Sequence, residues 1–186
     1  MGIYRWVGSQ CFKAGEFSDA QIFLSMGVTK LAPGETPVHY WRLLARAQYE
    51  NKHYQWALQS ITHAVNLDED PAHRVDMTLY RALCLNGLNK PEEAKATAVK
   101  ALKENPSGRT KALLLKLLGD IYFKELNYKE AAISFASITE FYDDTEILPY
   151  SIAMIVKSLE ASNKPSDAGV FRARLNKEFP KYTFPK

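Results

Sequence analysis

Apolar residues recur along this chain with the spacing of one face of an α-helix. Near the N-terminus they stand at i, i+3, i+4 and i+7, the pattern typical of a half-buried helix: Tyr4, Val7, Gly8 and Cys11. After a polar break the pattern resumes, at Ala20, Leu24, Gly27 and Val28. The first stretch of the chain is therefore predicted to form two helices joined by a turn.

The same two-helix pattern repeats through the whole sequence with one period. Five alanines are each separated from the next by 37 residues: Ala20, Ala57, Ala94, Ala131 and Ala168. Two further columns share that period, one of them mostly small (Gly8, Ala45, Ala82, Gly119, Val156) and one of them aromatic or proline (Phe17, Tyr54, Pro91, Tyr128, Pro165). A fixed period of this length indicates a repeat architecture. We predict an all-α chain of about ten antiparallel helices in one domain, with repeats near 1–37, 38–74, 75–111, 112–148 and 149–186.

Proline and small residues mark the parts of each repeat. Pro91 and Pro165 fall where the second helix should begin, a place that tolerates a missing backbone N–H. Small residues at repeat positions 8 and 20 are expected where the two helices of a hairpin approach most closely, because a large side chain would hold them apart.

The best copy of the pattern is LLKLLGDIYFKELNYKEAAISF, in which Gly119, Tyr122, Tyr128, Ala131 and Phe135 occupy the characteristic positions. This pattern resembles the tetratricopeptide repeat family, and the resemblance covers the entire chain. It implies a right-handed α-solenoid of five helix-turn-helix repeats. The period departs from the usual 34 residues, and the three extra residues are expected to lengthen the second helix or the inter-repeat loop. The 37-residue repeats also resemble, more weakly, the longer tetratricopeptide repeats of bacterial envelope arrays.

In the tetratricopeptide family the first helices line the concave face, and repeat positions 2, 5, 6, 9, 12 and 13 usually meet a bound peptide. Carried over to this sequence, the resemblance implies a partner-binding groove that combines basic and aromatic side chains: Arg5, Trp6, Phe12, Arg42, Arg46, Tyr49, Tyr80, Lys116, Asp120 and Phe123. Such a mixture suits acidic and apolar side chains of a protein or peptide. The alternative is structural: Arg46 precedes Glu50 by four residues, a helical pairing distance, and bulky aromatics at helical spacing are commonly packing groups.

Composition and charge remove several classes of function. A formal charge of +3 without clustered Lys and Arg does not predict a nucleic-acid binder, and no apolar run approaches the roughly 20 residues of a membrane span. Cys11 and Cys84 are too few for a disulfide framework or a zinc site of CxxC type. The four histidines fall in different elements, and no phosphate-binding or nucleophile motif occurs. We therefore predict no metal, no cofactor, no catalytic residue and no enzyme.

The sequence thus favours a non-catalytic protein–protein interaction scaffold that binds a partner segment in the groove of its first helices. The alternative is a structural, oligomerisation or spacer array within a larger assembly, such as one of the bacterial envelope or a secretion system, with self-association through an exposed end. Because the chain starts and stops on repeat boundaries, we expect an excised array. Its compartment is not assigned by the sequence: a soluble protein is expected, cytoplasmic or, if excised from a longer exported chain, periplasmic.

Overall fold

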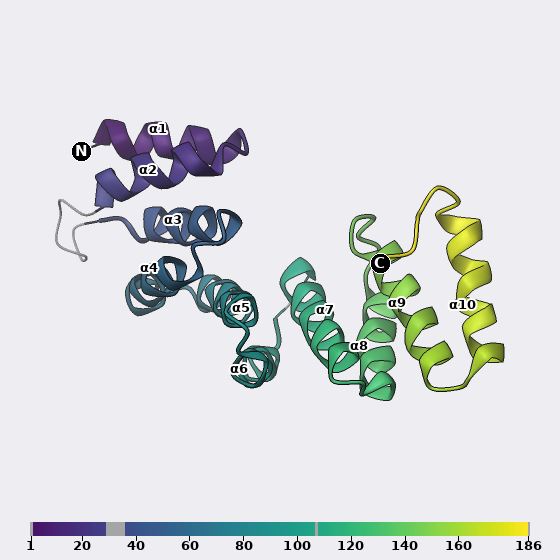
Figure 1. Cartoon of the computed structure of the whole chain (residues 1–186). Helices are drawn as coiled ribbons and strands as arrows, with labels where there is room; N and C mark the ends of the chain where they lie inside the picture. The colour runs from purple at the N-terminus through teal and green to yellow at the C-terminus, as the bar shows by residue number, and fades with distance from the viewer. Residues whose placement is uncertain (1, 29–35, 107, 186) are drawn as a thin grey trace. The chain divides into compact units, whose positions relative to one another are not determined.

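The computed structural model describes residues 2–28, 36–106 and 108–185, and in these ranges the chain forms helices and no strand. Figure 1 shows the helices following one another in antiparallel pairs. Their bounds are α1 (Gly2–Lys13), α2 (Phe17–Val28), α3 (Val38–Glu50), α4 (Tyr54–Leu67), α5 (Pro71–Gly87), α6 (Pro91–Lys103), α7 (Gly108–Lys124), α8 (Tyr128–Phe141), α9 (Leu148–Ala161) and α10 (Pro165–Glu178). The all-α fold with helix-turn-helix repeats is confirmed.

Every hairpin turns through three residues, and the middle one has a left-handed backbone. These residues are Gly15, Lys52, Asn89, Leu126 and Asn163, with φ between 58° and 79°. In the fourth repeat the N–H of Leu126 donates to the carbonyl of Phe123 at 3.1 Å, and that of Asn127 donates to Tyr122 at 2.9 Å. This pair of bonds is a Schellman motif, which satisfies carbonyls left free at the helix end. The other four turns have the equivalent bonds, so one turn geometry sets all five hairpins.

Proline begins helices where the sequence predicted it. Pro91 and Pro165 are the first residues of α6 and α10. Pro71 is the first residue of α5, and the preceding Asp70 accepts a hydrogen bond from the N–H of Ala72 at 2.8 Å. This side-chain cap and the proline both favour a helix start.

The extra residues of the long repeat lie partly in the first helices. α5 and α7 have 17 residues each, whereas α4 and α8 have 14. The expectation that only the second helix or the loop would lengthen is therefore wrong for the third and fourth repeats. The Asp70 cap gives a physical reason in the third repeat, because it starts α5 four residues before the repeat boundary at Val75.

Small residues at repeat position 8 allow close helix packing. A Cβ atom placed on Gly119 would lie 2.7 Å from Cζ of Phe135, and one placed on Gly8 would lie 2.9 Å from the backbone nitrogen of Leu24. The close partner of position 8 is thus position 24. The alanines at position 20 are also buried, from Ala20 to Ala168. The close approach predicted at position 8 is thus confirmed at Gly8 and Gly119, whereas a close approach at position 20 stays a prediction.

The contacts divide the chain into two compact units, Met1–Thr97 and Ala98–Lys186, with the boundary inside α6. The first unit has a core built on the first three repeats, which includes Leu24, Trp41 and Ile61. The second unit has a core around Phe135, Ile138 and Ile155. The organisation of residues 1–186 as a single solenoid stays a prediction.

Candidate protein-interaction surface

The first helices of the first unit lie side by side, α1 next to α3 and α3 next to α5. Their side chains meet around Arg46, whose Nε donates to the hydroxyl of Tyr80 at 3.0 Å. The guanidinium carbon lies 5.3 Å from the ring centres of both Phe12 and Tyr80. Tyr49 packs edge-on against Tyr80 at 5.4 Å. We call Phe12, Arg46, Tyr49 and Tyr80 the Arg46 cluster; it brings together four of the predicted groove residues from three helices.

The Arg46 cluster carries one positive charge among neutral rings. Burial, with a smaller contribution from Glu50, raises the pKa of Tyr49 to about 12. Burial also raises the pKa of Tyr80, against a lowering by Arg46. Both phenols therefore stay protonated at neutral pH. The Arg46–Glu50 pair that the spacing offered as an alternative is not formed, and Arg46 has no carboxylate partner among the residues described.

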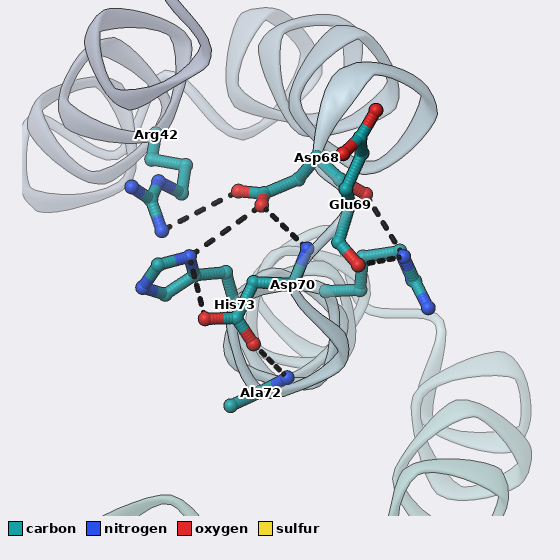
Figure 2. Close-up of polar contacts among 7 residues, drawn as sticks. Arg42, Asp68, Glu69, Asp70, Ala72 and His73 are labelled. Atoms are coloured by element: carbon teal, nitrogen blue, oxygen red, sulfur yellow. Dashed lines mark hydrogen bonds and ion pairs between the residues drawn. The ribbon is translucent and has the colours of Figure 1, made fainter.

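Arg42 has a structural partner instead. Its Nη1 lies 3.4 Å from Oδ2 of Asp68, a buried carboxylate at the end of α4. Figure 2 shows this carboxylate between Arg42 and the start of α5, where Oδ1 accepts the N–H of Asp70 at 3.1 Å and lies 3.4 Å from Nδ1 of His73. Arg74 donates to the carbonyl of Asp68 at 2.9 Å. Arg42 thus ties α3 to the connection between α4 and α5.

Arg5 and Trp6 lie on α1 outside the Arg46 cluster. The guanidinium of Arg5 stands 5.2 Å from the ring centre of Tyr40, and its Nε and Nη1 are buried without a hydrogen-bond partner in the described structure. Trp6 is 61% exposed. Desolvation, followed by the positive charges of Arg42 and Arg5, lowers the pKa of His39.

The predicted residues of the second unit form a separate polar group on α7. Nζ of Lys116 lies 2.8 Å from Oδ2 of Asp120 and 4.1 Å from the ring centre of Tyr150. The Tyr150 hydroxyl donates to Oδ1 of Asp120 at 2.5 Å. Burial and the Asp120 charge raise the pKa of Tyr150. Phe123 packs edge-on against Tyr128 at 5.3 Å. The charges of this group therefore neutralise one another.

Tyr150 and Lys157 contact these groups but were not predicted as site residues. Tyr150 stands at repeat position 2, one of the positions that the resemblance implied, so the signal was present in the sequence. Lys157 places its Nζ 5.9 Å from the ring centre of Phe123. It stands at repeat position 9, as Arg46 does over Phe12, and the two repeats use the same cation–ring register.

The described residues give little support to metal binding, membrane spanning or thiol chemistry. In those ranges no group of three His, Cys, Asp or Glu side chains is placed to hold a metal ion, and no helix there has the length and apolarity needed to cross a bilayer. Burial raises the pKa of the Cys84 thiol to about 12, which keeps it protonated and unreactive at neutral pH.

Comparison with known proteins gives the fold. No family model matches the chain, and no curated protein sequence does. Among solved structures, the apo form of RapI superposes with a TM-score of 0.79 at 14% identity, over 94% of this chain and 68% of that one. MamA gives 0.73 at 16%, over 100% and 99%. A thermophilic TPR protein of Thermus thermophilus gives 0.64 at 16%, over 97% and 92%. At these identities the likeness shows the fold alone, a TPR-like α-solenoid.

Proposed function

We propose that this TPR-like helical array is a non-catalytic protein-interaction scaffold whose Arg46 cluster binds a segment of a partner protein. The fold supports the general role, because helical repeats present an extended surface made of several helices. The particular surface is supported by the side chains that α1, α3 and α5 bring together.

The observation that carries the proposal is the state of Arg46. Its guanidinium is held between the rings of Phe12 and Tyr80, so its position is fixed before any partner arrives. Only its Nε is used within the described residues, in the bond to Tyr80. Arginine presents its remaining donors in a planar fork that suits a carboxylate. An ordered cation without a carboxylate partner is well placed to receive one from outside.

The surrounding rings define the rest of the partner. Phe12, Tyr49 and Tyr80 are each half-buried, so they offer ring surface to an apolar side chain. We infer that the preferred segment carries Asp or Glu beside an aromatic or aliphatic residue. Arg42 and Lys116 contribute less to recognition, because Asp68 and Asp120 already neutralise them.

The test uses peptides selected from a displayed random library against the complete chain. Fluorescence anisotropy then compares their affinity for the wild type, Arg46→Glu and a control, Lys100→Glu, which makes the same charge change at an exposed position of α6. We expect enrichment of acidic residues beside apolar ones. Arg46→Glu should weaken binding by about tenfold or more, from loss of a charge-assisted hydrogen bond.

The control should bind within about twofold of the wild type, since surface charges separated by more than a Debye length are largely screened. Equal loss in both variants would show only a long-range charge effect. Peptides that bind Arg46→Glu as tightly as the wild type would place recognition on another surface and refute the proposal.

A further inference from the structure

Arg5, like Arg46, is an ordered cation without a carboxylate partner in the described ranges of the chain. Its Nε and Nη1 are enclosed by the protein and make no hydrogen bond to any residue that the structure describes, although a buried donor without an acceptor is costly. The side chain is fixed by packing, because a Cβ placed on Gly27 of α2 would lie 2.5 Å from its Cγ. The residue as a whole is only half-buried, so an acceptor from outside can approach it.

Arg5 and Arg46 bridge the same two helices at two levels. Arg5 extends from α1 over the ring of Tyr40 on α3, with 5.2 Å between the guanidinium carbon and the ring centre. Arg46 extends from α3 over the ring of Phe12 on α1, at 5.3 Å. The two cations thus lie along one seam between neighbouring helices. We call Arg5 and Arg46 the arginine pair.

The helix geometry gives the separation within the arginine pair. α1 and α3 run in the same direction, because the antiparallel α2 stands between them in the chain. Phe12 follows Arg5 by seven residues on α1, and Arg46 follows Tyr40 by six residues on α3. At a rise of 1.5 Å per residue, the two cation–ring contacts therefore lie about 10 Å apart along the helices.

This separation selects the spacing of two carboxylates that the arginine pair can hold together. A polyproline II segment rises about 3.1 Å per residue with three residues per turn, so its residues i and i+3 lie on one face about 9 Å apart. A β-strand covers a similar distance in three residues, but its side chains alternate, so the second carboxylate would face away. An α-helix would need about seven residues to span the same distance.

The second unit shows what kind of segment a cation at the position of Arg46 can hold. Lys157 stands at repeat position 9 of α9, as Arg46 does on α3, and lies 5.9 Å from the ring centre of Phe123. Its Nζ donates to the carbonyl of Pro185 at 2.9 Å. Pro185 belongs to segment 179–185, which forms no helix and contains a second proline. The occupant at this position is thus a proline-containing, non-helical segment.

We propose that the arginine pair binds a partner segment in the polyproline II conformation that carries two acidic side chains three residues apart. One carboxylate pairs with Arg5 and the other with Arg46, each through the planar fork of the guanidinium. The rings of Phe12, Tyr40 and Tyr80 surround the two cations, and proline-rich segments dock on aromatic-lined grooves. This inference rests on the proposed function, because the Arg46 cluster supplies one of the two contacts.

The test measures the binding of synthetic proline-rich peptides to the complete chain by fluorescence anisotropy. Every peptide carries one Glu–Phe pair for the Arg46 cluster, and a second glutamate is absent or stands two, three or four residues from the first. We expect the three-residue spacing to bind about tenfold more tightly than the single-glutamate peptide, because it gains a second charge-assisted hydrogen bond. The other two spacings should bind like the single-glutamate peptide, since they turn the second carboxylate off the binding face.

Arg5→Gln isolates the second contact. It should remove the tenfold gain and leave the single-glutamate peptide unchanged, which also shows that the Arg46 cluster remains folded. The matched control is Lys13→Gln, which makes the same charge change at an exposed position of the same helix. This control should keep the full gain, and circular dichroism should show that both variants remain helical.

The outcomes separate this inference from the proposed function. A second glutamate that adds nothing, an equal gain at every spacing, or a gain that survives Arg5→Gln would overturn the arginine pair while binding at the Arg46 cluster stands. Equal loss of the gain in Lys13→Gln would reduce it to a long-range charge effect and overturn it too. If Arg46→Glu left the single-glutamate peptide bound as tightly as the wild type does, the proposed function would fail, and this inference with it.

Discussion

Gly119→Ala should destabilise the second unit although alanine is the better helix former. Gly119 lies in the middle of α7, and an added Cβ would come within 2.7–2.9 Å of three ring atoms of Phe135. That ring is fully buried and cannot move aside freely. Gly169, in the middle of α10, has nothing within 4 Å of the equivalent position. The two glycines therefore test the same substitution with and without a close neighbour.

The magnitude follows from two opposing contributions. Replacing glycine by alanine inside a helix gains about 1 kcal/mol, whereas overpacking a core costs about 1–3 kcal/mol. Gly169→Ala should raise the free energy of unfolding by up to about 1 kcal/mol. Gly119→Ala should lower it by about 1 kcal/mol, because the steric cost exceeds the helix gain.

Urea unfolding followed by circular dichroism measures both variants, and both sites belong to the same unit. Phe135→Leu provides the rescue: a shorter side chain should make room, so Gly119→Ala should cost less in that background. A double-mutant cycle gives the coupling energy. If Gly119→Ala stabilised the protein as much as Gly169→Ala, or if Phe135→Leu left its effect unchanged, the close-approach argument would be refuted.

Three further predictions test particular contacts. Arg42→Gln should lower the free energy of unfolding by about 2 kcal/mol, which is less than the loss of a fully buried ion pair because Arg42 is 20% exposed. Urea unfolding measures this change, and an unchanged midpoint would show that the Arg42–Asp68 pair does not stabilise the fold. Leu126 is 69% exposed and has a left-handed backbone, so Leu126→Gly should raise the free energy of unfolding by about 1 kcal/mol and raise the thermal midpoint with it. A lower thermal midpoint would contradict the backbone strain. Because the pKa of Tyr49 is raised from 10.0 to about 12, the folded state disfavours tyrosinate, so stability present below pH 10 should fall as the pH rises towards 12; Tyr49→Phe should reduce this dependence, and an identical alkaline profile would exclude Tyr49 as its source.

The periodic features of this fold could be predicted because packing acts at the same position in every repeat. Gly8 and Gly119 stand opposite the large Leu24 and Phe135, and Ala45 and Ile61 occupy the same two positions in the second repeat. Contacts between first and second helices therefore leave columns of small and large residues in the sequence. The helix starts at Pro91 and Pro165 could be predicted because proline at the first position of a helix has a local cause, the missing backbone N–H.

The left-handed turns escaped sequence analysis although they also recur every 37 residues. Gly15, Asn89 and Asn163 are residue types that favour this conformation, whereas Lys52 and Leu126 adopt it because two backbone hydrogen bonds hold each turn. The backbone geometry is the same in all five repeats of this chain while the side chain varies. A search for a single residue type therefore does not find the column.

The grouping of the side chains in the Arg46 cluster could be predicted from the repeat positions, but the ion pairs of the neighbouring arginine could not. Arg42 and Arg46 lie four residues apart on α3 and looked equivalent. Their difference comes from Asp68, in an inter-repeat connection that has no equivalent acidic residue at the same place in the next repeat. The interactions of Arg42 thus depended on a contact that periodicity does not describe.

The most direct test of the proposed scaffold role is to observe where a bound peptide contacts the chain. Selective ring labelling of tyrosine allows nuclear magnetic resonance to follow Tyr49 and Tyr80 in the Arg46 cluster together with Tyr128 and Tyr150 in the second unit. On titration with a selected acidic peptide, the account predicts saturable shifts of the Tyr49 and Tyr80 rings while Tyr128 and Tyr150 stay unchanged. Shifts confined to Tyr128 and Tyr150, or binding that leaves all four rings unshifted, would contradict it.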